Sequence, residues 1–507
     1  MIITSWAFSR WMALIYLAAF WSLGVQILGL IGHHGILPAG DFLRYVGQAE
    51  GAGRFWVAPT LCWFDHSDGF LLFLCWGGAG LSILLLLGVM PALTAFLLWL
   101  FYLSLTVAGQ DFLGFQWDNL LLEAGFLLIF LVPRGFSIQF KPSVRPSIVI
   151  VWLLRWLLFR LMFESGMIKL LSGDTNWSHL TALTYHYWTQ PLPNMISWYA
   201  NQLPLWFQKL SCAVLFIIEI LVPFFIFCGR RGRLIAFFGI TGLQVLIILT
   251  GNYCFFNLLA ISLCLTLLED EHLIFLRGKN SSVIASVAKQ SFKKIATSLS
   301  APRNDIITQR EIFYKIVTGL VAAFVLTVSL SLMADSFAHL PLPKPVEKLL
   351  TAVGPLRSIN NYGLFAVMTT QRNEIILEGS NDGENWLAYE FRYKPGNVDQ
   401  APRWAMPHQP RLDWQMWFAA LGNWRENQWL MALMVRLLQG EPSVINLLAT
   451  NPFPDHPPKY IQATFWEYHF TDFKTKGPHG PWWRREIKGL YCPTLSLQQF
   501  TPYDSGR

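Results

Sequence analysis

Apolar residues gather in nine runs along the chain, each near the length of a helix that crosses a membrane. The hydrocarbon core of a bilayer, about 30 Å thick, needs about 20 mostly apolar helical residues. The runs cover residues 11–32, 70–88, 91–109, 118–133, 148–170, 210–228, 233–250, 252–268 and 313–334. They predict a polytopic α-helical membrane protein with about nine transmembrane helices.

Basic residues lie in four alternate connections between the apolar runs and orient the helices. They are Arg10, residues 134–145, residues 230–233 and residues 277–311. Connections rich in Lys and Arg stay on the cytoplasmic side of a membrane. This arrangement leaves three regions on the other side: residues 33–69, residues 171–209 and the chain from residue 335 onward.

The connection at residues 280–305 differs in composition from its surroundings. It is rich in Ser, Ala and Lys, and Phe292 is its one aromatic residue. It is similar to translated repeat elements that are inserted in some bacterial reading frames, which favours a bacterial inner membrane. It is also interpreted as a basic cytoplasmic linker, and both interpretations predict exposure to solvent. Residues 1–334 are therefore predicted to be one helical domain that contains this linker.

Beyond the last apolar run the pattern becomes strand-like. Strands are predicted at residues 364–368, 374–380, 386–393 and 460–470. The first three form a small antiparallel β meander, with Asp-Gly turn chemistry at residues 381–385. Residues 413–440 have a helical pattern with Asp413 as N-cap, which fits packing on the strands or lying on the membrane surface. Since about 170 residues can bury a core, residues 335–507 are predicted to be an extracytoplasmic α+β domain.

Charged residues also occur inside the apolar runs. The fourth and fifth runs contain Asp118, Glu123, Arg155, Arg160, Glu164 and Lys169. Charges at membrane depth are costly and need partners or a function. Arg160 and Glu164 are four residues apart on one helix face, which predicts an ion pair between them. Asp118 and Glu123 are the expected partners of Arg155 or Lys169.

Two interpretations of these charges remain open. In one, they form a structural network that fixes how the helices pack. In the other, they line a polar cavity that opens outward with Lys169 at its mouth, where a desolvated lysine would serve as a base or nucleophile. A lysine paired closely with Glu123 or Glu164 would instead stay charged and inert.

Composition narrows the classes of function. Only 14% of residues are charged, and the basic residues behind the net charge of +7 lie in short loops, so nucleic-acid binding is not expected. No catalytic, nucleotide or metal motif occurs, and His179 and His186 are too isolated to define a metal site. No cofactor is expected. Of seven cysteines, Cys62 and Cys492 alone lie outside the apolar segments and form the one candidate disulfide pair.

Several long segments together resemble the lipase maturation factor family. They are "QILGLIGHHGILPAG" (residues 26–40), "QWDNLLLEAGF" (116–126), "LRWLLFRLMFESGMIKLLSGDTNW" (154–177), "LTALTYHYWTQPLPNMISWY" (180–199), "TGNYCFFNLL" (250–259), "EIILEGSNDGENWLAYEFRYKPG" (374–396) and "PHQPRLDWQMWFAAL" (407–421). The resemblance implies a polytopic membrane protein that helps exported lipases reach their active state, in the endoplasmic reticulum for its best-understood members. Its partners would be exported client proteins and the lipid bilayer.

The membrane part is also similar, more distantly, to the membrane core of vitamin K-dependent carboxylase. Lys169 in "IKLLSGDTNW" falls at the place of that enzyme's catalytic lysine and is followed by Asp174 and Trp177. The spacing is looser here, and no other segment marks a quinone or glutamate site. The resemblance implies, as an alternative, a membrane enzyme that uses Lys169 as a base on a lipid, quinone or protein.

Aromatic residues in the outer regions form the candidate client surface. They are Trp177, Tyr185, His186, Tyr187, Trp188 and Gln190 in the loop of residues 171–209, with Trp414 and Trp417 in the outer domain. Exposed Trp and Tyr suit recognition of apolar surface on an immature protein. The loop alternatively packs on the outer domain as a rigid lid. The expected location is a bacterial inner membrane with a periplasmic C-terminal domain, or the endoplasmic reticulum membrane with this domain in the lumen.

Overall fold

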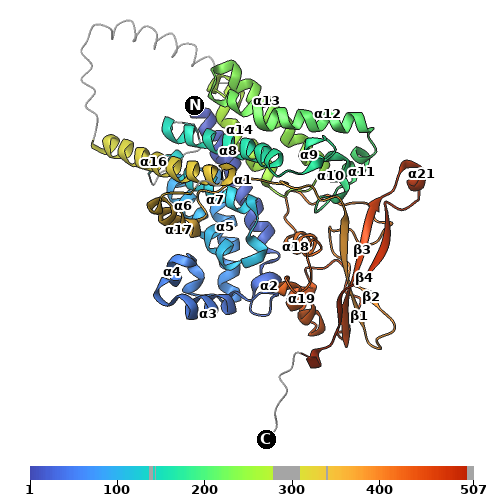
Figure 1. Cartoon of the computed structure of the whole chain (residues 1–507). Helices are drawn as coiled ribbons and strands as arrows, with labels where there is room; N and C mark the ends of the chain where they lie inside the picture. Colours follow the sequence, from blue (N-terminus) through green and yellow to red (C-terminus); the bar gives the residue numbers. More distant parts are fainter. Residues whose placement is uncertain (136–140, 143, 278–308, 339–340, 500–507) are drawn as a thin grey trace, which may run out of the picture.

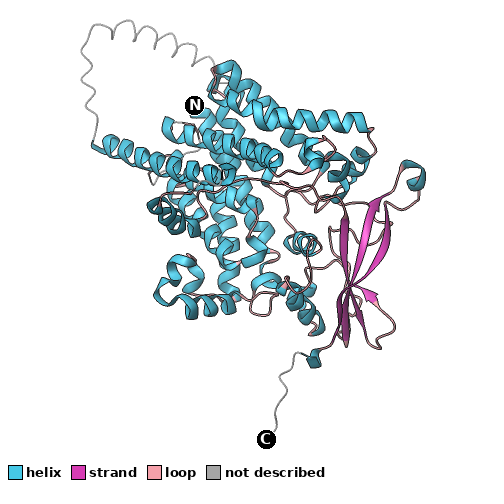
Figure 2. Ribbon diagram, in the orientation of Figure 1, coloured by secondary structure: helices cyan, strands magenta, loops and turns pink. Residues whose placement is uncertain are grey.

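The computed structural model describes residues 1–135, 141–142, 144–277, 309–338 and 341–499 (Figure 1). The helices form one large group, and a four-stranded sheet stands beside it, as Figure 2 shows. The serine-rich stretch at residues 280–305, which is most of the predicted cytoplasmic linker, lies outside the described residues.

Each of the nine apolar runs contains a helix. They are α1 (Ile2–Gly24), α5 (Asp68–Leu87), α6 (Pro91–Ala108), α7 (Gln116–Leu131), α8 (Ile148–Leu171), α12 (Leu205–Phe216), α13 (Arg230–Thr250), α14 (Phe256–Cys264) and α16 (Gln309–Ala338). Among the described residues, six are long and apolar enough to cross a membrane, with α12 counted together with its continuation to residue 227. The other three fall short because α7 and α14 are short and α8 carries four charged side chains. The chain is thus a multi-pass helical membrane protein, and the count of nine spans stays a prediction.

The segment that begins with α12 is irregular. A π-helical turn, η4 (Ile217–Leu221), follows α12, and a 3-10 segment, η5 (Val222–Phe227), completes it. Pro223 has no N–H to donate to the preceding turn, which explains the break in regular hydrogen bonding. Gly166 of α8 lies against the π turn, and a Cβ there would approach Cβ of Glu219 within 2.9 Å. The glycine therefore allows the π turn to bring Glu219 close to α8.

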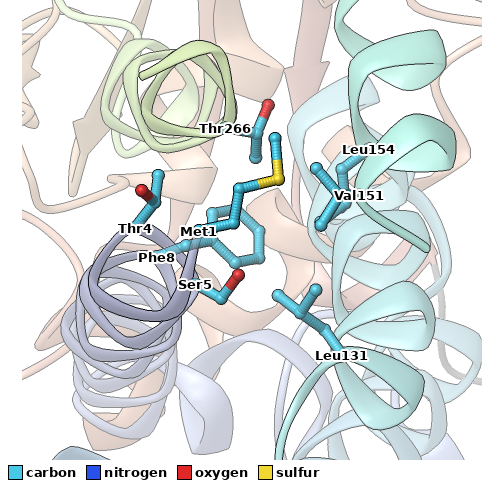
Figure 3. A pocket seen from close by; sticks show the side chains of 8 residues that line it. All are labelled: Met1, Thr4, Ser5, Phe8, Leu131, Val151, Leu154 and Thr266. Carbon is cyan, nitrogen blue, oxygen red and sulfur yellow. The ribbon is translucent and has the colours of Figure 1, made fainter. Parts of the chain in front are cut away.

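The N-terminal helix is closely packed and capped from a distant segment. The backbone N–H groups of Ile2 and Ile3 donate to the Asp270 carboxylate at 2.8 and 2.9 Å. This carboxylate satisfies N–H groups that no helical carbonyl can reach. Figure 3 shows the Met1 side chain at a gap of about 10 Å³ between α1, α7 and α8. Such a space holds at most one water molecule, so this gap is a small packing defect.

The sheet differs in connectivity from the predicted meander. Its order is β2 (Leu387–Ala388), β1 (Arg372–Ser380), β3 (Tyr460–Phe470) and β4 (Trp483–Leu495), and all neighbours are antiparallel. Two hairpins are thus joined through β1 and β3, which are far apart in sequence. Residues 364–368 form no strand, and the predicted strand at residues 386–393 is reduced to two residues. The hairpin turn at residues 381–385 is present, with Gly383 at φ +80°.

The helix predicted at residues 413–440 is two helices. They are α18 (Arg411–Ala419) and α19 (Gln428–Leu438), which pack on β1 and β3 rather than lying on a membrane surface. Between them Asn423 accepts from the N–H of Arg425 at 3.0 Å, a local bond that competes with helix continuation. Asp413 is not the N-cap: it lies inside α18 and accepts from the N–H groups of Tyr393 and Lys394 at 2.8 and 2.9 Å.

The sheet region and the membrane helices share one apolar core. The cluster of buried side chains is continuous from Phe8 in α1 to Cys492 in β4. In Figure 1, α18 and α19 lie between the membrane helices and the sheet, and α18 also packs on η3 (Gln110–Leu113), just before α7. The outer region is therefore packed against the helical group.

Candidate functional site

All six charged residues predicted inside the membrane part are buried. As whole residues, all are at most 4% exposed: Asp118, Glu123, Arg155, Arg160, Glu164 and Lys169. They do not form one continuous network, however. Their contacts divide them into four groups, and the partners differ from those expected from the sequence.

The first group is an ion pair between α7 and α18. Arg411 donates from both terminal nitrogens to Asp118, with distances of 2.8 and 2.9 Å to its two oxygens. Tyr102 of α6 also donates to the same carboxylate. Asp118 was expected to pair with Arg155 or Lys169, and this expectation is wrong. Its true partner lies 293 residues later, so no local spacing could indicate it.

The second group attaches the segment just before β1, at residues 360–362, to α7 and α8. Glu123 accepts from Arg160, from the Tyr362 hydroxyl at 2.7 Å and from the Asn360 N–H at 2.9 Å. Glu164 accepts from the Tyr362 N–H at 2.7 Å. The expected ion pair between Arg160 and Glu164 is replaced by the pair with Glu123. The carboxylates of Glu123 and Glu164 instead both accept hydrogen bonds from the backbone of residues 360–362.

Arg155 forms the third group, at the opposite end of α8. It donates from Nε and Nη2 to the carbonyl of Thr266, at 3.0 and 2.7 Å. Thr266 lies in η6 (Leu265–Leu267), at the end of the α14 helix. Helix C-terminal carbonyls are unsatisfied and carry partial negative charge, which a guanidinium offsets. The expected partners of Arg155, Asp118 and Glu123, are engaged elsewhere.

Lys169 forms the fourth group. Its Nζ lies 2.7 and 2.9 Å from the two oxygens of Glu219 and 3.1 Å from the Ser165 carbonyl. The indole ring of Trp177 lies 5.5 Å from the same nitrogen. The prediction that Lys169 pairs with Glu123 or Asp118 is also wrong. Glu219 reaches Lys169 because it projects from the π turn η4, and π-helical turns recur at functional sites.

The ion pair between Lys169 and Glu219 borders a large cavity in the membrane part. This cavity has a volume of about 440 Å³ and is enclosed by α8, the α12–η4 segment, α13, α14 and the loop of residues 171–209. Most of its wall is apolar. Its polar lining includes Lys169, Glu219, Gln244, Tyr253 and Asn257, each at most 7% exposed.

His186, from the short helix α10 (Leu183–Thr189), also lines the cavity. Its Nε2 lies 3.2 Å from the Tyr253 hydroxyl. Burial, and then the nearby charge of Lys169, lower the pKa of His186 to about 4. The imidazole is therefore neutral near pH 7. Within the described residues, no group of three or more potential metal ligands converges, here or elsewhere.

The predicted client surface is mostly not at the surface. Five of its residues are buried, namely Trp177, Trp188, Gln190, Trp414 and Trp417, whereas Tyr185, His186 and Tyr187 are half-buried. The outer region covers them: Trp177 donates to the Phe365 carbonyl at 3.0 Å, and Trp417 to that of Thr189 at 2.9 Å. Of the two interpretations of this loop, the open surface is wrong, and the contacts fit the alternative in which the loop packs on the outer domain.

A different apolar surface lies where the outer region meets the membrane helices. A groove of about 350 Å³ has Trp414 and Trp417 in its wall. Its rim carries Val367, Phe418 and Leu421, whose side chains are 65%, 42% and 51% exposed. Sequence reasoning selected the two tryptophans and missed the three rim residues, because α18 was predicted without its true boundaries or orientation.

The candidate disulfide is not formed. Cys62 and Cys492 are both free and buried, Cys62 in the turn η2 (Leu61–Trp63) and Cys492 on β4. Burial raises the pKa of each thiol to about 11. Both therefore act as small apolar side chains and are poor nucleophiles.

The fold and the buried contacts define a multi-pass helical membrane protein with a sheet-containing C-terminal region packed on its helices. Residues 3–275 match the family model described as the lipase maturation factor transmembrane domain. Residues 358–493 match the model described as the lipase maturation factor C-terminal domain. The chain belongs to the lipase maturation factor family.

Curated relatives cover nearly the whole chain. Lipase maturation factor 2 of Xenopus laevis is 38% identical over 95% of this chain and 81% of its own length. The human protein of the same name is 36% identical over 97% of this chain and 82% of its own length. Lipase maturation factor 1 of Bos taurus is 33% identical over 98% of this chain and 90% of its own length. No solved structure matches the chain significantly.

Proposed function

We propose that this chain is a membrane-embedded maturation factor for exported proteins and that its clients are lipases. The family membership supports the client class, because relatives over almost the full length are named for lipase maturation. The groove beside α18 is the observation that carries the mechanism. It offers the exposed aromatic and aliphatic side chains that an immature client with apolar surface would contact.

The groove suits transient binding. Its wall is rigid, because Trp414 and Trp417 are buried and Trp417 donates a hydrogen bond to Thr189. Its rim residues, Val367, Phe418 and Leu421, are free to be covered by a partner. An aromatic pocket with an apolar rim contributes binding energy without defining a sequence, which fits release once the client has buried its own core.

The proposed location follows from the basic connections. Residues 1–334 would form the membrane domain and residues 335–507 the extracytoplasmic domain. Arg230, Arg231 and Arg233 lie at the start of α13, and this end would face the cytoplasm. The membrane would be a bacterial inner membrane or the endoplasmic reticulum membrane, with the groove on its periplasmic or lumenal side, where exported proteins fold.

Replacing both Phe418 and Leu421 by serine is expected to reduce the specific activity of exported lipases. Each lost apolar side chain removes about 1.5–3 kcal/mol of burial, so client binding should weaken at least about tenfold. The measurement is lipase activity per lipase molecule, in cells that lack the native chain and express the variant at equal membrane level.

The matched control replaces Ile487 and Leu490 by serine. These β4 side chains are 55% and 61% exposed and do not line the groove. This variant should support lipase activity as the native chain does. An equal loss in both variants would reject the groove as the client site, and normal lipase activity in cells without the chain would reject lipases as clients.

A second candidate function is favoured by the position of Lys169 on a cavity wall. An enzyme would need this amine as a base, whereas a maturation factor needs only a neutral, well-packed site. We expect the double variant Lys169→Met, Glu219→Leu, which removes both charges together, to restore lipase activity in the same cells. Failure to do so at equal membrane level would favour the enzyme. Lys169→Ala alone leaves Glu219 buried without its cation, so it should lower the amount of protein.

A further inference from the structure

The cavity beside Lys169 opens toward the bilayer. Its mouth is formed by Leu203, Phe207, Leu210 and Val214 near or on α12 and by Leu246 on α13, all between 39% and 60% exposed. Along the segment that runs from α12 to η5, α13 packs mostly against η5, at the far end, and less against α12 itself. Exposed apolar side chains on membrane helices face lipid tails. The gap between the two helices is thus an entrance for a molecule dissolved in the membrane.

The size and wall of the cavity suit one apolar molecule. Its volume of about 440 Å³ lies inside the usual range for ligand sites, roughly 300–1,000 Å³. Four of its polar lining residues, Lys169, Glu219, Gln244 and Asn257, are at most 7% exposed and so lie deeper than the exposed mouth side chains. A ligand that fills the space must therefore be an amphiphile, with a long apolar part and a small polar end.

The buried polar residues in the cavity lining carry no net charge that could bind a charged ligand. Lys169 and Glu219 are the charged residues in its lining, and they neutralise each other at 2.7 Å. His186 adds no charge near pH 7, as its lowered pKa indicates. A phosphate or carboxylate brought into this low-dielectric space would lack a counter-ion of its own. The ligand must be neutral.

One acceptor in the cavity wall lacks a donor. Asn257 is fully buried, and its Nδ2 donates to Gln244 Oε1 at 2.7 Å. Its Oδ1 has no hydrogen-bond partner among the described residues and is itself covered, so a ligand donor reaches it only once the amide turns toward the cavity. A buried carbonyl oxygen without a partner is costly, and a donor on a ligand would remove this cost. The smallest neutral donor that a lipid carries is a hydroxyl group.

We propose that this cavity binds a neutral lipid with a free hydroxyl group, which enters between α12 and α13 and donates to Asn257. Diacylglycerols and long-chain alcohols share this chemistry. The apolar chain lies along the walls formed by α8, α12 and α13. The cavity and the client groove share Tyr253, Leu364 and Phe365 in their linings. The lipid assignment does not rest on the client assignment, so either can fail without the other.

The test uses the purified full chain in phospholipid nanodiscs and a diacylglycerol with a photoreactive diazirine in its acyl chain. After irradiation, mass spectrometry should locate the label on cavity residues of α8, α12 or α13. The same probe with its hydroxyl capped as a methyl ether should label about tenfold less, because Asn257 stays unsatisfied. A phosphatidic acid probe should label least. Competition by unlabelled diacylglycerol or by a long-chain alcohol identifies which source of the hydroxyl binds better.

Two matched variants place the site. Leu246→Trp adds bulk at the mouth and should abolish specific labelling. Ile235→Trp lies on the same helix, is also lipid-exposed at 52% and does not line the cavity, so it should label as the native chain does. Equal labelling of both variants, labels outside the cavity, or equal labelling by the methyl ether would each overturn the proposal. Equal thermal unfolding of the two variants checks that both are folded.

Discussion

Replacing Arg411 by methionine is expected to lower the free energy of unfolding by about 3–5 kcal/mol. The methionine keeps the apolar volume but leaves the Asp118 carboxylate buried without its cation. Asp118 is 0% exposed and accepts two hydrogen bonds from this one guanidinium, so water cannot replace the partner. Denaturant-induced unfolding in detergent micelles, followed by tryptophan fluorescence, measures the loss.

A second variant separates two effects: the loss of the ion pair, and the cost of leaving the Asp118 carboxylate buried without a cation. Arg411→Met combined with Asp118→Leu removes both charges and should recover most of the stability, since buried ion pairs are often replaceable by apolar pairs. Arg484→Met is the matched control, because this arginine is exposed on β4. If Arg411→Met and Arg484→Met unfold at the same denaturant concentration, the ion pair contributes no stability.

Replacing Glu123 by leucine is expected to have a similarly large effect, with a different local consequence. The substitution leaves Arg160 buried without a carboxylate and removes the acceptor of Tyr362 and Asn360. We expect a loss of about 3–5 kcal/mol and release of the segment just before the sheet. Limited proteolysis should cut the variant between residues 357 and 371, where the native chain is protected.

The comparison variant for this site is Glu164→Gln. An amide oxygen can still accept from the Tyr362 N–H, so its cost should stay near about 1 kcal/mol. Joint replacement, Glu123→Leu with Arg160→Met, should restore most of the stability but not the protection of Tyr362. Proteolysis of Glu123→Leu at the native rate would show that other contacts hold this segment.

The sequence predicts which charges are buried but not how they pair. The apolar runs around Asp118, Glu123 and Lys169 indicate that these residues are buried, because neighbouring sequence alone shows that the segment is apolar. Their partners, Arg411, Arg160 and Glu219, are set by how helices and a distant outer segment meet. The expected pair of Arg160 and Glu164 was wrong because helix spacing makes such a pair possible, whereas the Tyr362 backbone competes for the same carboxylate.

The strands show the same division. β3 was predicted at its observed residues because its sequence alternates in the way that a half-buried strand requires. β4 was missed, since most of its residues are exposed and charged ones interrupt the alternation, as on an edge strand. The candidate groove depends on how α18 packs, and the cavity depends on the π turn at Glu219. Neither the packing nor the π turn can be predicted from a single sequence.

The pair of Asp118 and Arg411 has a consequence for how the chain is made. A ribosome delivers Asp118 to the membrane long before Arg411 exists, because 293 residues separate them. During this interval the newly inserted helix carries a carboxylate at membrane depth with no cation to neutralise it. The membrane helices therefore reach their final packing only after the C-terminal region has been made and has folded back on them. A chain that stops before residue 411 is left with this carboxylate without its cation, a state that membrane quality control can recognise and remove.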